Sequence, residues 1–349
     1  MGERGWDTVV LGGGPVGLAT ALIAARYGRV LIVLPRPAPA ASVFRIDCVP
    51  VALLALFVEL GVHPGELAAS PVYDRRLVAW ESTTPEIVDG GAGTVHILRP
   101  ALEHRLLERA RAHPAIGFTF NTALDALPAA NRILDATGRR AITADHRHLP
   151  PNPAILRGVI VRGAFSRAQQ AFRLASLPTG YAYRLGTGDV LMVGLVQGRD
   201  QWRESAGLLA ERLRAMGVEW LLAGMRRDTG EGIIGGVASV QWSSGSGPAI
   251  RIGDAGFARD ALASQGIANG ISAGLSLFEG RDAGRSYCRQ TRIEILSHLT
   301  TLRRLIRSCA HSAHPFWENY AAFLARARPG GLTHSDLIDP GTLADADVI

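Results

Sequence analysis

The chain has 349 residues, of which 47% are hydrophobic and 19% charged, a balance that excludes a disordered chain and allows two globular domains. Its 37 basic residues are all arginine, because the sequence contains no lysine, and they are scattered along the chain. Since no basic stripe is interleaved with aromatic residues, the net charge of +6 does not predict a nucleic-acid-binding surface.

The cysteines and the apolar segments bear on compartment and metal content. Cys48, Cys288 and Cys309 are far apart and form neither a C-x-x-C pair nor a Cys/His cluster of the zinc type. This pattern predicts reduced thiols, no metal site and a cytoplasmic location. The apolar stretch near the start is interrupted by glycines and lacks a basic leader, so we expect neither a signal peptide nor a membrane span.

The first predicted elements form a strand, a glycine-rich turn, a helix and a second strand. The strands cover residues 9–11 and 30–34, and the helix covers 16–27 and ends before Gly28. Glycines follow the first strand with G-x-G-x-x-G spacing, at Gly12, Gly14 and Gly17. In this position they indicate a dinucleotide site, with the pyrophosphate at the helix N-terminus beside Pro15 and Val16. The alternative is an ordinary glycine-rich turn.

The end of the second strand departs from the usual dinucleotide pattern. An Asp or Glu normally stands there and accepts hydrogen bonds from the ribose hydroxyls. This chain has Pro35 followed by Arg36. Arg36 either contacts the adenosine or a phosphate, or is a solvated arginine, and we expect weaker retention of the dinucleotide than usual.

Further along the chain, helical and strand patterns fall into separate groups. The predicted elements are helices over 51–60, 101–113 and 202–216, and strands over 74–82, 94–100, 132–138, 157–163 and 189–196. They divide the chain into a discontinuous nucleotide-binding domain (1–75, 95–150 and 250–280), a substrate domain (76–94 and 151–249), a helical segment (281–330) and a tail (331–349). The loops 35–43 and 239–248 are predicted to border the cleft or, alternatively, to be ordinary connectors.

The segment IGDAGFARDALASQGIANG, residues 252–270, resembles the GDA…P…GQG segment of glutathione-reductase-type FAD enzymes. The resemblance implies that FAD is the cofactor and that Asp254 binds its ribityl chain; alternatively, Asp254 only caps a turn. It also implies that Gln265, Gly266 and Ile267 lie at the flavin, where backbone N–H groups at a helix N-terminus stabilise negative charge. Ala261 replaces the proline of the family pattern.

Three more stretches extend the resemblance to the flavoprotein hydroxylases and to their tryptophan halogenase-like branch. LDATGRRA places Gly138 near the adenosine, and ILRPALEHRLL places Arg99 near the pyrophosphate. RIDCVPVALLALFVELGV is similar to a segment of the halogenase-like branch, with Asp47 in place of its glutamate. HPFWENY, residues 314–320, resembles the C-terminal PFW motif of that branch. The SQG and PFW motifs are also similar to motifs of the flavoproteins that mature tryptophylquinone cofactors.

The resemblance implies an α/β fold in which a discontinuous, Rossmann-like FAD-binding domain carries an inserted, mostly antiparallel β substrate domain and C-terminal helices. It implies an FAD-dependent monooxygenase that uses O2, through a flavin C4a-hydroperoxide, to hydroxylate an aromatic substrate. An indole or tryptophan, free or in a polypeptide, is the expected substrate. NAD(P)H or a separate flavin reductase would supply electrons. The alternatives are a flavin dehydrogenase or oxidase of a small molecule, and a catalytically silent maturation chaperone with a flavin fold.

Halogenation is not expected. Halogenases of the branch carry a catalytic lysine, and their W-x-W-x-I-P signature aligns with residues 181–186, where both tryptophans and the proline are missing.

Few side chains identify themselves as catalytic. Asp47 is the candidate base or orienting group, or else the N-cap of the helix over 51–60. Tyr181 and Tyr183 alternate along a strand and so share one face, directed either at the substrate or into the core. His96 and His104 are interpreted as surface residues.

Overall fold

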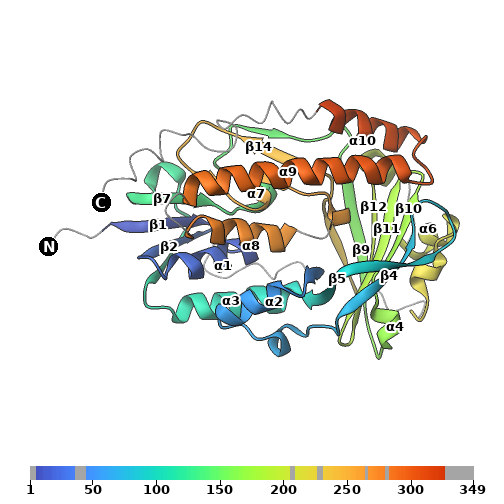
Figure 1. The fold of residues 1–349 in the computed structure, drawn as a ribbon, viewed down its shortest axis with the longest axis horizontal. Coiled ribbons are helices and arrows are strands. Elements are labelled where there is room, and N and C mark those ends of the chain that lie inside the picture. Colours follow the sequence, from blue (N-terminus) through green and yellow to red (C-terminus); the bar gives the residue numbers. More distant parts are fainter. Residues whose placement is uncertain are drawn as a thin grey trace.

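The computed structural model describes residues 5–35, 45–204, 209–225, 231–263, 266–279 and 283–326. Two sheets dominate it (Figure 1). The first is parallel, with strand order β15-β7-β1-β2-β6. Its strands are β1 (Trp6–Leu11), β2 (Val30–Leu34), β6 (Ile116–Phe120), β7 (Ala130–Asp135) and β15 (Ile250–Arg251). The predicted strands over 9–11 and 30–34 lie here, as does the first part of the strand predicted over 132–138, so the expected Rossmann-like parallel sheet is confirmed.

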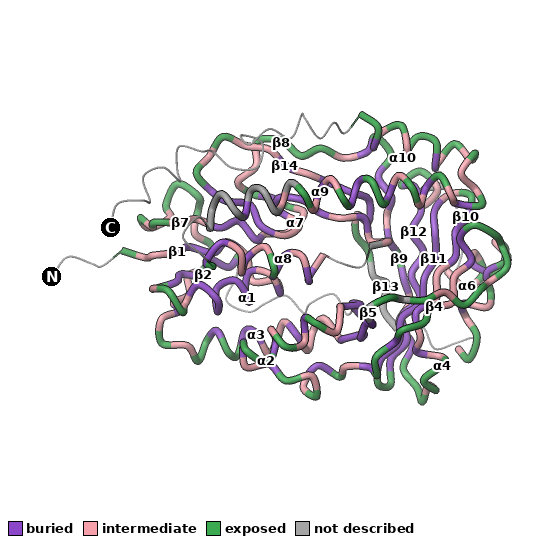
Figure 2. Tube along the Cα trace, in the orientation of Figure 1, coloured by how far each residue is buried: buried purple, intermediate pink, exposed green. Residues whose placement is uncertain are grey.

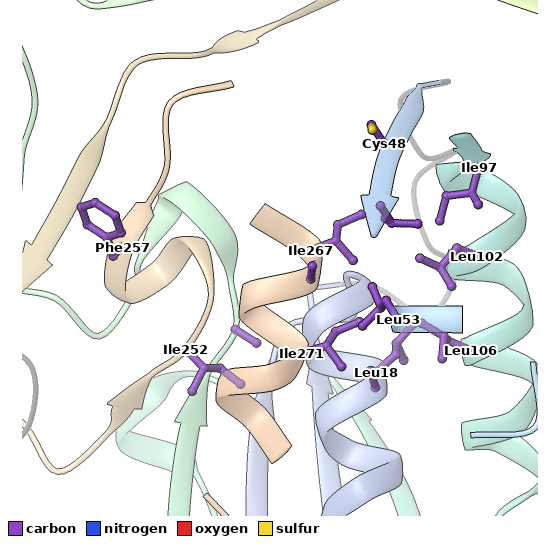
Figure 3. Packing of buried hydrophobic residues seen from close by; sticks show 14 of the residues in the cluster. Leu18, Cys48, Leu53, Ile97, Leu102, Leu106, Ile252, Phe257, Ile267 and Ile271 are labelled. Carbon is purple, nitrogen blue, oxygen red and sulfur yellow. The ribbon is translucent and has the colours of Figure 1, made fainter. Parts of the chain in front are cut away.

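The central strands of this sheet are short and apolar on both sides, because both faces of the sheet are covered. β2 is buried along its whole length. The helices α1 (Pro15–Ala24), α3 (Arg99–Ala112) and α8 (Gly266–Ser276) lie together beside the sheet (Figure 1). Helices α1 and α8 approach closely because glycines face α1: a Cβ atom at Gly274 would lie 2.2 Å from the Thr20 hydroxyl oxygen. Figure 3 shows Ile271 of α8 close to Leu18 of α1 in this layer.

The second sheet has strand order β13-β9-β12-β11-β10-β4-β5-β3 and is antiparallel except where β10 pairs with β4. Its strands are β3 (Ile46–Pro50), β4 (Tyr73–Ala79), β5 (Glu86–Leu98), β9 (Ala154–Arg162), β10 (Arg173–Leu177), β11 (Gly180–Thr187), β12 (Val190–Gly198) and β13 (Glu231–Val237). The expected mostly antiparallel sheet is therefore present. The domain boundaries remain a prediction, and β3, which they assign to the nucleotide-binding domain, pairs in this sheet.

The C-terminal helices connect the two sheets. Helix α9 (Ala283–Ser308) runs from one sheet to the other (Figure 1). Near its start, the Tyr287 hydroxyl donates a hydrogen bond to the Arg251 carbonyl in β15. Near its end, the Leu305 carbonyl accepts one from the indole of Trp80, the residue after β4. Helix α10 (Pro315–Arg326) packs through Trp317, whose indole donates to the carbonyl of Leu177 in β10 at 2.8 Å. Much of the large sheet under these helices is buried (Figure 2).

The remaining elements include two that the periodicity of apolar residues did not predict correctly. The segment 239–248 contains a strand, β14 (Gln241–Ser244), paired with β8 (His146–His148), so its interpretation as a loop is wrong there. The helix predicted over 202–216 is described as α5 (Arg199–Glu204) and α6 (Leu209–Ala215). The other helices are α2 (Leu53–Glu59), α4 (Arg167–Gln170) and α7 (Asp254–Phe257), with 3-10 turns at Pro64–Leu67, Leu124–Ala126, Gly138–Arg140, Glu219–Leu222 and Ala261–Ala263. Within the described ranges, no helix is long and apolar enough to cross a membrane.

Candidate cofactor and substrate site

A cavity of about 850 Å³ lies where the carboxyl ends of the parallel strands meet the large sheet. Most of the residues that line it belong to segments that the sequence singles out. The predicted site residues that line it are Gly12, Gly14, Pro15, Val16, Asp47, Arg99, Gly138, Tyr183, Asp254, Gly266 and Ile267. A ligand site at this edge of an open parallel sheet is the expected position for a nucleotide.

The glycine turn has the shape that a phosphate cradle requires. Gly12 has a φ of +108°, and a Cβ atom there would lie 2.7 Å from the Ala136 carbonyl oxygen. A Cβ atom at Gly17 would lie 2.2 Å from the Gly12 carbonyl oxygen, so this glycine allows helix and turn to pack. At Gly14, which precedes α1, a Cβ atom would meet nothing within 4 Å. The turn is therefore tight beneath the cavity and open toward it.

The loop after β7 forms the next part of the wall. The carboxylate of Asp135 is fully buried and accepts hydrogen bonds from the backbone N–H groups of Thr137 at 2.9 Å and Thr143 at 3.0 Å. These bonds fold the loop back on itself. Gly138, with a φ of +65°, is then presented to the cavity.

The far end of the cavity is formed by residues after β2 and β6. Pro35, Asn121 and Thr122 line it, and no described residue of these two strand ends supplies a carboxylate there. Arg36 lies outside the described residues, so its predicted contact remains a prediction. This end is consistent with the expectation that the usual ribose-binding acid is missing.

Asp254 and the start of α8 lie together at the middle of the cavity. One carboxylate oxygen of Asp254 is 3.3 Å from where a Cβ atom of Gly266 would be, and the other is 3.9 Å from Nε of Arg139. The N-cap of α7 is Gly253, and Asp254 is the first residue of that helix. Its carboxylate is 40% exposed and lines the cavity. Its role at a ribityl chain and its role as a turn cap both remain predictions. Gln265 lies outside the described residues.

Asp47 joins two arginines on the opposite wall. Its carboxylate accepts hydrogen bonds from Arg99 at 2.7 and 3.2 Å and is 3.1 Å from Nε of Arg45. Burial opposes ionisation, but the two guanidinium groups outweigh it and hold the pKa of Asp47 below its ordinary value of 3.8. Glu103, which also lines the cavity, lies 3.8 Å from Arg99, so two carboxylates face the two guanidinium groups. Asp47 is consequently a weak base and a strong orienting group for Arg99.

The N-cap alternative for Asp47 is wrong. Helix α2 starts at Leu53 with Ala52 as its N-cap, whereas Asp47 lies within β3. The pairing partners of Asp47 are Arg45, immediately before β3, and Arg99, in the first turn of α3, and the sequence separates these two arginines by some fifty positions.

Tyr181 and Tyr183 share one face of β11, as predicted, with ring centroids 6.5 Å apart. Only Tyr183 lines the cavity, and its hydroxyl has no hydrogen-bond partner among the described residues. Burial raises the pKa of Tyr183 to about 12, so the phenol stays protonated and can donate or accept. Tyr181 is 2% exposed and donates to Asp260 at 2.8 Å. For Tyr181 the core alternative holds.

Several site residues were not identified from the sequence. Arg139 donates to the carbonyl oxygens of Ser239 at 2.6 Å and Arg259 at 2.9 Å, so it links the loop after β7 to two other segments of the wall. Asp260 and Arg45 also line the cavity. Arg139 directly follows the DATG stretch, so the sequence motif could have identified it. The burial of Asp260 could not be predicted, because it depends on residues from distant elements.

The two histidines behave differently. His104 is a surface residue, with a side chain that is 65% exposed, as predicted. The surface interpretation of His96 is wrong: it is fully buried, and its Nδ1 lies 2.8 Å from the Gly186 carbonyl oxygen. Burial lowers the pKa of His96 to about 4, so it is neutral and structural.

Among the described residues, no group of His, Cys, Asp and Glu could hold a metal ion, and Cys48 and Cys309 are free and buried.

Comparison with known proteins identifies the fold. No family model matches the chain, and no curated protein matches it. Among solved structures, the chain is similar to the myxobacterial chondrochloren halogenase, an FAD-dependent enzyme, with a TM-score of 0.68 and 17% identity over 97% of this chain and 92% of that one.

Two further structures show the same similarity. A peptidyl tryptophan dihydroxylase essential for tryptophylquinone cofactor biogenesis matches with a TM-score of 0.66 and 21% identity, over 91% of this chain and 79% of that one. A probable FAD-dependent monooxygenase from Pseudomonas aeruginosa matches with a TM-score of 0.59 and 16% identity, over 98% and 99% of the two chains. The chain therefore has the α/β fold found in FAD-dependent halogenases and monooxygenases.

Proposed function

We propose that the cavity binds FAD non-covalently. The observation that carries the proposal is that one continuous cavity joins the glycine turn, Asp254 and the N-terminus of α8. The turn is open at Gly14, where a pyrophosphate would lie, and the guanidinium groups of Arg45 and Arg99 line the same cavity. Asp254 would hold the ribityl chain, and the backbone N–H groups of Gly266 and Ile267 would face the flavin.

The proposed reaction is hydroxylation of an aromatic substrate by an FAD-dependent monooxygenase. Bound FAD, once reduced, supplies the chemistry that activates O2 and transfers one oxygen atom. The protein's own contribution is to enclose and orient the substrate and to keep water out. Apolar side chains at Leu156, Leu185 and Val237 line the wall beside Tyr183, and their chemistry suits an aromatic ring.

An indole or tryptophan ring is the proposed substrate, either as a small molecule or as a side chain in a polypeptide. The unpartnered phenol of Tyr183 would accept a hydrogen bond from the indole N–H or donate one to a ring substituent. The fold is shared with a peptidyl tryptophan dihydroxylase, which supports the choice of a tryptophan ring.

The electron source is proposed from the motif content. The chain contains one G-x-G-x-x-G fingerprint at a strand-to-helix turn, which the FAD site uses. Electrons would therefore come from transiently bound NAD(P)H or from a separate flavin reductase. Halogenation is not proposed although halogenases share the fold, because the sequence has no lysine.

Isotope labelling tests the reaction class. FAD-loaded protein, a reductant and 18O2 would be incubated with free tryptophan, with simple indoles and with a tryptophan-containing precursor polypeptide. Incorporation of one or two labelled oxygen atoms into a product is the expected result. A product oxidised without label would instead identify a dehydrogenase or oxidase, and reduced protein that does not react with oxygen would identify a silent flavin-fold chaperone.

A further inference from the structure

The buried carboxylate of Asp260 lies in the loop that connects α7 to α8. Asp260 is 1% exposed, yet no arginine of the described chain forms an ion pair with it. Its oxygens instead accept hydrogen bonds from the hydroxyls of Tyr181, at 2.8 Å, and Tyr320, and from the backbone N–H of Leu262 at 2.9 Å. Three of roughly four acceptor positions on the carboxylate are thus filled by neutral donors.

This arrangement differs from that of Asp47, which is neutralised by two arginines. A buried carboxylate is costly unless its oxygens are satisfied, so the two tyrosines are needed to keep Asp260 in place. Burial raises the pKa of Asp260 above its ordinary value, and its hydrogen bonds offset only part of this effect. The position of the loop therefore depends on partners in β11 and α10.

The other contacts of the loop are also with segments distant in the sequence. The backbone N–H of Ala261 donates to the Ala238 carbonyl at 2.8 Å, a bond that the proline usual in the family pattern could not form. The hydroxyl of Tyr320 accepts from the backbone N–H of Val240 at 3.0 Å while it donates to Asp260. Tyr320 thus connects Val240, two residues after the wall segment 235–238, to Asp260 in the wall segment 259–261.

We propose that α10 is a positioning element of the cofactor site: Tyr320, together with Tyr181, holds Asp260 and thereby sets the place of the loop from which α8 starts. The predicted effect on FAD affinity rests on the proposed function, whereas the predicted effect on the position of the loop does not. It gives a physical function to the HPFWENY motif, because Trp317 of the same helix fixes α10 on the large sheet through its bond to Leu177. Tyr181, Asp260 and Tyr320 are positioning residues rather than catalytic ones.

Hydrogen exchange of the FAD-free protein tests the positioning directly. Tyr320→Phe and Tyr181→Phe each remove one donor to the carboxylate and leave the ring in place. We expect either change to raise the exchange rate of the loop amides, including those of Ala261 and Leu262, by about tenfold or more, the usual effect of losing a hydrogen bond to a charged group. Tyr73→Phe is the matched control, since Tyr73 is a buried tyrosine of β4 that does not line the cavity.

FAD provides the second readout. Both loop variants should bind FAD about tenfold more weakly and shift its visible absorption spectrum, whereas the control should match the wild type. Loop exchange that is unchanged in both variants, or raised equally in the control, would overturn the proposal. If the wild type binds no FAD, the proposed function fails, while the exchange experiment still decides the role of α10.

Discussion

Replacing Asp47 with asparagine should destabilise the protein markedly at neutral pH. The change removes the carboxylate that lies 2.7 Å from Arg99 and 3.1 Å from Arg45, and leaves Arg99 with only the more distant Glu103, at 3.8 Å. Removing one partner of a fully buried ion pair costs about 3–5 kcal/mol. The arginine side chains are 23% and 36% exposed, so water recovers part of this cost. We therefore expect the free energy of unfolding to fall by about 2–3 kcal/mol.

The pH dependence of this loss follows from the sign of the pKa shift. The pKa of Asp47 is lower in the folded protein than its ordinary value of 3.8, so its contribution to stability is fully present above that value. It is lost as the pH falls through the lower folded-state pKa. The difference between wild type and variant should therefore be constant from about pH 8 to pH 5 and shrink below pH 4.

Urea unfolding at several pH values measures the difference. Asp189→Asn is the control, because Asp189 forms an exposed ion pair with Arg162 at 3.4 Å and should change stability by less than about 0.5 kcal/mol. A loss below about 1 kcal/mol for the Asp47 variant, or a loss that does not depend on pH, would refute the claim that this carboxylate holds the two arginines.

The remaining predictions concern the cavity. Gly17→Ala should destabilise the protein by about 1–3 kcal/mol, because the added methyl group would meet the Gly12 carbonyl, whereas Gly14→Ala should leave the thermal midpoint unchanged and weaken FAD binding. Asp254→Ala should abolish FAD binding in calorimetry without altering the circular dichroism spectrum; unchanged affinity would exclude its role at the ribityl chain. Tyr183→Phe should raise KM for the indole substrate about tenfold at unchanged FAD affinity, and an unaltered KM would remove Tyr183 from the substrate site.

The sequence was most informative where local patterns decide the structure. The second strand is found where it was predicted, from Val30 to Leu34, because a short, fully apolar run between breakers has few alternatives. The glycine turn could be predicted because Gly12 and Gly17 each meet a backbone requirement that other residues violate.

The parts that were missed depend on contacts between distant elements. His96 was assigned to the surface because its position near the end of a strand does not reveal its contacts. In the structure Tyr73 stacks on its ring, and its Nδ1 lies 2.8 Å from the Gly186 carbonyl oxygen. Tyr181 and Tyr183 have the same periodicity, and only the position of Asp260 directs one hydroxyl into the core. Long-range pairing of this kind leaves no local signal in a single sequence.

The most direct test of the account is a titration of the purified, cofactor-free protein with FAD, followed by fluorescence quenching or calorimetry. The account predicts saturable binding of one FAD per chain, lost in Asp254→Ala and weakened in Gly14→Ala. A protein that is correctly folded by circular dichroism yet takes up no FAD at any attainable concentration would contradict it.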